Sequence, residues 1–219
     1  MILYHGSKTL LKYPKPKGSN HTNDYGPSFY LTKDLKSAKS WACRNDTVGI
    51  VNKYSIENKS YKKLKILNLT DKTKYSVLNW IAILMHFRKL DEAFKKTNQI
   101  VLDWLQQYYI DVEQYDVVVG FRADDSYFRF PARFVTNDLA FEDLDNIYLL
   151  GSLGIQYAFM SKRAIGLLKF ESEIPCEKAF VGHYYHVIYN ATKVFDEILD
   201  YPRDPAKTYV LDLMRKQHE

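Results

Sequence analysis

The sequence is poor in cysteine and contains no long hydrophobic run. Cys43 and Cys176 are the two cysteines among 219 residues. They are too few for a disulfide framework and do not form a Cys-x-x-Cys pair, so a reducing compartment is the simpler interpretation. No stretch of about 18 apolar residues could span a bilayer, and the opening "MILYHGS" leaves no room for a secretory signal. We therefore expect a cytoplasmic protein without a membrane partner.

Several common catalytic and nucleic-acid-binding motifs are also missing. The sequence has no Walker loop, no Gly-x-Gly-x-x-Gly and no Gly-x-Ser-x-Gly, which removes the main support for P-loop, Rossmann and α/β-hydrolase folds. The net charge of +5 is modest, and the positive residues are scattered outside "YPKPKGS" and "NKSYKKLK". Such a charge permits a polyanionic partner without requiring one. Without a dense basic face or a helix-turn-helix pattern, a dedicated duplex-DNA binder is not indicated.

What is present indicates an ordinary folded domain. Hydrophobic residues make up 46% of the chain and charged residues 26%, and an aromatic share of 15%, led by 18 tyrosines, argues against disorder. The length suits one domain, or one domain with a small appendage. We expect a domain over residues 1–170, with a helix-rich insert at about 75–110, and a helical C-terminal extension over residues 171–219.

The hydrophobic periodicity predicts an α+β fold. We expect strands at "ILYH", 28–32, "GIVNKYSI", "KKLKILNL", 115–119, 156–160 and 167–170, and helices at 34–44, in the insert and at about 177–199. Thr32 or Asp34 could cap the first helix. "YFRFPARF" predicts a buried helix whose Arg129 and Arg133 extend to solvent, with single-stranded nucleic-acid binding as the alternative.

Three sequence blocks occur in a characteristic order: "LYHGS" on the first strand, "GPSFYLT" on the second with "KSAKSW" in the helix after it, and "GIQYAF" on a late strand. They resemble the blocks of diphtheria-toxin-type ADP-ribosyltransferases, the branch that contains the poly(ADP-ribose) polymerases. With "VNKYS", "YDVVVGFRADD" and "LKF" added, the chain is more similar to an uncharacterised bacterial and phage-borne family of small ADP-ribosyltransferase-like proteins. The resemblance covers about residues 1–170. It implies a split, mainly antiparallel β-sheet around an NAD cleft, with flanking helices.

The resemblance assigns roles to residues of the first two blocks. His5 matches the first member of a catalytic triad and is expected to donate a hydrogen bond to the adenine-side ribose of NAD. Gly6 would pair its backbone with the nicotinamide carboxamide, and Ser7 keeps the family's small hydroxyl. Tyr30 matches the second member, whose ring stacks on nicotinamide.

The helix after the second block adds two further candidates. Ser37 lies where the family often has a serine near the carboxamide. Trp41 follows four residues later and would share its helix face, but the stacking aromatic of the polymerases comes one residue earlier.

The third block departs from the family, because Gln156 stands where a glutamate is usual. A glutamine can orient the ribose but cannot supply negative charge to an oxocarbenium-like transition state. This favours transfer of a single ADP-ribose over chain elongation, or loss of activity. Asp124 and Asp125 follow the strand at 115–119 and are candidates to orient NAD or deprotonate the acceptor.

Each candidate also has a structural interpretation. His5 could form a hydrogen bond within the fold, Tyr30 could be a core aromatic, and Gln156 could be an edge or solvent-facing strand residue. The pair Asp124 and Asp125 could cap a helix that starts at Ser126. A metal set of Cys176, His183 and His186 would provide only three ligands, at a spacing unlike common zinc patterns, so we expect no metal.

The predicted function is mono-ADP-ribosyl transfer from NAD, as co-substrate, to a macromolecular acceptor, whether protein, DNA or RNA. The resemblance implies a toxin or antiphage role with a neutralising antitoxin protein as partner. The alternatives are an RNA 2′-phosphotransferase-like enzyme and a catalytically silent NAD- or nucleic-acid-binding module.

Overall fold

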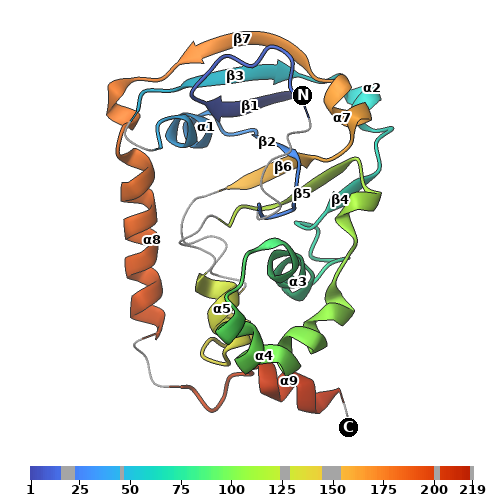
Figure 1. Ribbon diagram of the computed structural model, residues 1–219, viewed down its shortest axis with the longest axis vertical. Helices are drawn as coiled ribbons and strands as arrows, with labels where there is room; N and C mark the ends of the chain where they lie inside the picture. The colour runs from blue at the N-terminus through green and yellow to red at the C-terminus, as the bar shows by residue number, and fades with distance from the viewer. Residues whose placement is uncertain (16–22, 45–46, 124–128, 145–153, 200–202, 218–219) are drawn as a thin grey trace.

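The computed structural model describes residues 1–15, 23–44, 47–123, 129–144, 154–199 and 203–217, and these form an α+β fold (Figure 1). One mixed sheet has the strand order β4-β5-β6-β2-β1-β3-β7. The strands are β1 (Ile2–Ser7), β2 (Phe29–Thr32), β3 (Ile50–Ser55), β4 (Ile66–Asn68), β5 (Val117–Phe121), β6 (Ile155–Phe159) and β7 (Lys169–Pro175). Only the β4–β5 pair is parallel among these. The predicted α+β class and mainly antiparallel sheet are confirmed.

The contact between β1 and β2 is the narrowest in the sheet. Their ladder consists of the single pair Tyr4↔Thr32, whereas β1 pairs with β3 along its whole length and β2 with β6 along all of its own. We call the β1–β2 contact the seam. It joins a half made of β4, β5, β6 and β2 to a half made of β1, β3 and β7, and the two halves lie one above the other in Figure 1.

Helices flank the sheet. They are α1 (Leu35–Ala42), α2 (Asn58–Tyr61), α3 (Val77–Phe87), α4 (Glu92–Leu105), α5 (Arg129–Val135), α7 (Lys162–Gly166), α8 (His183–Leu199) and α9 (Val210–Lys216), with 3-10 turns η1 (Gln106–Tyr108), η2 (Val112–Gln114) and η3 (Lys178–Phe180). No helix in the described ranges is long and apolar enough to cross a membrane.

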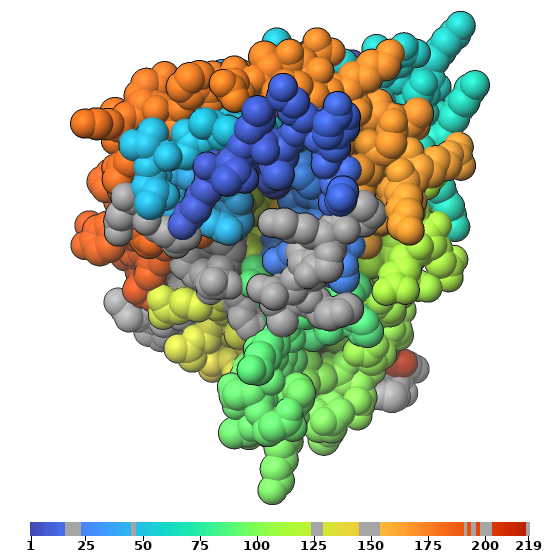
Figure 2. Space-filling model, turned by 45° about the horizontal axis from the view of Figure 1, so that its top comes forward, coloured from blue at the N-terminus to red at the C-terminus, as the bar shows by residue number. Residues whose placement is uncertain are grey.

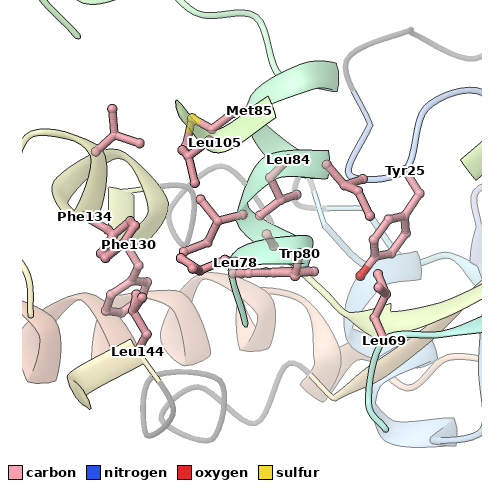
Figure 3. Packing of buried hydrophobic residues seen from close by; sticks show 14 of the residues in the cluster. Tyr25, Leu69, Leu78, Trp80, Leu84, Met85, Leu105, Phe130, Phe134 and Leu144 are labelled. Atoms are coloured by element: carbon pink, nitrogen blue, oxygen red, sulfur yellow. The ribbon is translucent and has the colours of Figure 1, made fainter. Parts of the chain in front are cut away.

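The core lies mainly between the sheet and the helical insert. Figure 3 shows Trp80 and Leu84 of α3 in the same cluster as Phe130 and Phe134 of α5. On β5, Val118 joins this cluster, while Val117 packs on the opposite face with residues of α7. Burial on both faces explains why β5 is a continuous valine run. In α5 the phenylalanines are buried and the two arginines are exposed, as the sequence predicted.

Helix α1 packs directly on β1 because residue 6 is glycine. A Cβ atom there would overlap the carbonyl oxygen of Ala38 and crowd the amide nitrogen of Ala42. The helix begins where Asp34, one of the two predicted caps, accepts a hydrogen bond from the amide of Ser37. The glycine of the first block therefore has a packing role that the sequence pattern did not reveal.

The chain after α7 differs from the prediction. The strand expected at 167–170 is β7 at Lys169–Pro175, because Ser161 caps α7 and this helix continues to Gly166. The helix expected at about 177–199 begins at His183, after η3. In Figure 1, α8 descends from the β7 end of the molecule and α9 lies beside α4. Val210 of α9 is fully buried, and Trp104 of α4 donates to Gln217 at 2.7 Å.

Gly6→Ala should lower the free energy of unfolding by about 1–3 kcal/mol, the cost typical of forcing an extra methyl into a packed interface. Gly166→Ala is the matched control, because a Cβ there meets no atom within 4 Å. Urea unfolding followed by circular dichroism measures both. Equal stability of Gly6→Ala and wild type would show that α1 does not depend on this close approach.

Candidate functional site

The three residues singled out by the sequence blocks lie on three neighbouring strands. His5 is on β1, Tyr30 on β2 and Gln156 on β6. In the β2–β6 ladder, Thr32 pairs with Gln156 and Tyr30 with Ala158, so Tyr30 and Gln156 share one face of the sheet. In the β1–β2 pair it is Tyr4 that lies opposite Thr32, so the His5 side chain lies on the other face of the sheet, with Phe29. Figure 2 shows the N-terminal segment that carries His5 at the surface, between α1 and the residues around α7.

His5 connects the two halves of the sheet through its side chain. Its Nδ1 lies 2.7 Å from the carbonyl oxygen of Tyr30, and its ring stacks on Phe29 with centroids 4.5 Å apart. A carbonyl oxygen only accepts, so Nδ1 carries the proton and Nε2 is the acceptor of the neutral ring. The expected role of His5 as a donor to ribose therefore requires the imidazolium form, whereas the neutral ring would accept from a ribose hydroxyl.

The hydroxyl of Tyr30 holds the turn before β2. It donates to the carbonyl oxygen of Gly26 at 2.7 Å and accepts from the amide of Tyr25 at 3.0 Å. Burial, together with the nearby charge of Asp24, raises the pKa of Tyr30 well above its ordinary value, so this hydroxyl stays protonated. Tyr30 thus has a structural role in addition to any contact of its ring with a ligand.

Gln156 is buried, which rules out the solvent-facing interpretation; its side chain meets a carboxylate. Nε2 donates to Oδ2 of Asp24 at 2.7 Å and lies 3.3 Å from the carbonyl oxygen of Phe121. Both Gln156 and Asp24 are less than a tenth exposed. A negative charge therefore does lie beside the third block, and it comes from a residue that the sequence patterns did not select.

Asp24 is surrounded by hydrogen bond donors. Arg88 forms an ion pair with Oδ1, and the amide of Ala123 donates to Oδ2 at 2.8 Å. Burial raises the pKa of the Asp24 carboxyl, while the Arg88 charge and the donors from Ala123 and Gln156 oppose that rise. Since every polar neighbour here donates, both oxygens of Asp24 act as acceptors. In the sequence, Asp24 lies two residues before the second block, "GPSFYLT".

The end of β5 is fixed in the same region. The carbonyl oxygen of Phe121 accepts from the hydroxyl of Tyr25 at 2.7 Å and from Nε1 of Trp80 at 3.2 Å. The Tyr25 ring lies over Gly120, where a Cβ atom would overlap its hydroxyl. Burial raises the pKa of Tyr25 well above its ordinary value. The site is thus supported by β5, β6, α3 and the turn at residues 23–28.

The remaining candidates of the first block and of α1 have partners within the fold. Ser7 accepts from Nδ2 of Asn52 at 2.9 Å and donates to the carbonyl of Thr9. Ser37 lies in the first turn of α1. Neither arrangement tests the contacts with nicotinamide that the resemblance implies.

Trp41 is covered by other side chains. The guanidinium groups of Arg44 and Arg122 lie 3.6 and 4.0 Å from its ring centroid, and Tyr184 of α8 contacts it edge to face at 5.7 Å. In this arrangement Trp41 connects α1 to the C-terminal extension and does not offer a bare ring to a nicotinamide.

Two further sets of candidate residues were singled out from the sequence. Asp124 and Asp125 lie outside the described residues. Cys176, His183 and His186 are described, and no group of three metal-ligating side chains occurs within that part of the chain. His183 instead contacts the hydroxyl of Ser40 at 3.2 Å, and Cys176 packs beside Cys43 under α1.

The fold and the site define an α+β domain with a buried Asp24–Gln156 pair on the β6 side of β2 and a histidine at the narrow seam on its other side. A family model described as "Protein of unknown function (DUF3990)" matches residues 1–170, and the chain belongs to this family. No curated protein and no solved structure gives a significant match.

Tyr30→Phe should lower the free energy of unfolding by about 1–3 kcal/mol, because the Tyr25 amide and the Gly26 carbonyl lose their common partner in a buried region. Tyr13→Phe serves as the control, since Tyr13 is 84% exposed. Thermal melts of both variants give the comparison. A Tyr30→Phe protein as stable as Tyr13→Phe would mean that the turn does not need this hydroxyl.

Proposed function

We propose that this protein is an NAD-dependent mono-ADP-ribosyltransferase that transfers one ADP-ribose unit to a macromolecular acceptor. The observation that carries the proposal is the placement of Tyr30 and Gln156 on one face of β2 and β6, with a buried carboxylate hydrogen-bonded to Gln156. His5, on the neighbouring strand β1, is bonded to the backbone carbonyl of Tyr30. The one-pair seam also supports the split sheet that the resemblance implies.

The reaction exchanges one bond at C1′ of the nicotinamide ribose. The bond from C1′ to the pyridinium nitrogen breaks, its electron pair goes to that nitrogen, and nicotinamide leaves as a neutral molecule. The acceptor's nucleophile bonds to C1′ and loses its proton to a base or to water. Positive charge builds up on the sugar during this exchange, so hydrogen bond acceptors and negative charge nearby lower the barrier.

His5, Tyr30 and Gln156 would each contact a different part of NAD. His5, fixed by the Tyr30 carbonyl, would bind a hydroxyl of the adenine-side ribose. The Tyr30 ring, held by the turn, would form the wall against nicotinamide. Gln156 would bind the nicotinamide ribose. Its neutral amide favours a single transfer, because it cannot activate a second ribose hydroxyl as a base.

Calorimetry with NAD and an assay for released nicotinamide test the proposal. We expect NAD to bind and nicotinamide to be released slowly, and labelled NAD to mark a lysate component that is sensitive to either protease or nuclease. A folded protein that neither binds NAD nor releases nicotinamide would contradict the proposal. Binding without any release would instead indicate the catalytically silent module.

His5→Ala should reduce nicotinamide release by about 10²-fold, the scale of one lost orienting hydrogen bond in an active site. His186→Ala, on the exposed part of α8, is the control and should release nicotinamide at the wild-type rate. Initial rates at saturating NAD give the comparison. Equal rates for the two variants would remove His5 from the site.

A further inference from the structure

The orientation of the Gln156 amide is determined by its surroundings. Nε2 faces the Asp24 carboxylate and the Phe121 carbonyl, which only accept hydrogen bonds. A flipped amide would place its oxygen against two other oxygens, so the nitrogen must occupy this position. Oε1 is therefore the opposite end of the amide, and within the described residues it accepts no hydrogen bond. The group that Gln156 can offer to a ligand is an acceptor.

Asp24 is in turn held from two other elements. Arg88 is the C-cap residue of α3, and its side chain is 13% exposed where it pairs with Asp24. The amide of Ala123, two residues past the end of β5, holds the other oxygen. A series of hydrogen bonds therefore connects the helical insert to the sheet. Arg88 and Gln156 each donate to the carboxylate of Asp24, which lies between them.

We propose that Asp24, held by Arg88, is a positioning residue that orients and polarises Gln156, so that Oε1 of this glutamine accepts a hydrogen bond from a hydroxyl of the nicotinamide ribose. The inference rests on the proposed function. It goes further in naming the carboxylate and the atom through which it acts. An amide that donates to a carboxylate gains electron density on its oxygen, because hydrogen bonds in a chain strengthen one another. The Asp24–Gln156 pair thereby takes over part of the task of a glutamate.

A purely structural Asp24 would have different consequences. Its ion pair with Arg88 would then only fix the turn at residues 23–28, and its loss would lower stability without a separate effect on the reaction. Asp116 offers a matched comparison, because its carboxylate accepts from the Ser161 hydroxyl at 2.6 Å and from the Lys65 amide at 2.9 Å, away from the seam. Asp116→Asn should be destabilised and keep the wild-type rate.

The experiment is a double-mutant cycle of Asp24→Asn and Gln156→Met, with rates and NAD affinity measured below the melting temperature of every variant. Asp24→Asn should lower kcat by about 10- to 100-fold, the scale found for partners that orient metal ligands, and change KM less than about threefold. If Asp24 acts through Gln156, adding Asp24→Asn to Gln156→Met should cost little more. An additive loss, or a wild-type kcat in Asp24→Asn, would overturn the inference while leaving the proposed function intact.

Gln156→Glu keeps the test decisive if Asp24→Asn does not fold. It restores the residue usual in the related enzymes but places a second carboxylate against Asp24, so we expect at least a tenfold lower kcat than wild type. A rate at or above wild type would show that Gln156 does not need its bond to Asp24 and would overturn the inference. A wild-type protein that neither binds NAD nor releases nicotinamide would remove the proposed function and this inference with it.

Discussion

Burial of the Asp24 carboxylate is the constraint on which the site depends. Removing an ionised carboxylate from water costs several kcal/mol unless donors replace the lost hydration. Those donors come from the end of α3, the segment after β5 and the start of β6. These three elements therefore converge on Asp24 and hold the turn at residues 23–28. The hydrogen bonds to the Asp24 carboxylate therefore stabilise one arrangement of the insert relative to the sheet.

The seam between β1 and β2 is held by few backbone hydrogen bonds. A sheet normally gains its rigidity from continuous ladders, but β1 and β2 share one residue pair, and the next contact along the chain is the imidazole of His5 on the Tyr30 carbonyl. A side chain thus takes the place of a backbone donor at the point where the strands part. This arrangement keeps His5 in a fixed orientation at the seam.

Much of the fold could be predicted from the sequence, because local signals determine it. Strand positions followed from alternation and valine runs to within a few residues, and Asp34 capped α1 as its residue type suggested. The strand predicted at 167–170 begins two residues later, at Lys169, since α7 continues to Gly166.

The site was less predictable, since its partners are remote in the chain. Arg88 lies 64 residues from Asp24 and Gln156 lies 132 residues from it, and no spacing rule connects them. The side chains that pack on Trp41 likewise include Arg122 and Tyr184 of α8. The sequence of α1 alone could not predict these contacts. Local periodicity identifies which face of a strand is buried, but a buried charge is explained only by the tertiary contacts around it.

The C-terminal extension has a mechanical consequence for the site. Its first helix, α8, rests on α1 beside the β1 half of the sheet, and α9 is anchored on α4 of the insert, which packs under the other half. The extension therefore bridges the two halves of the molecule through its two helices, so the loss of either contact would remove one of the links between these halves.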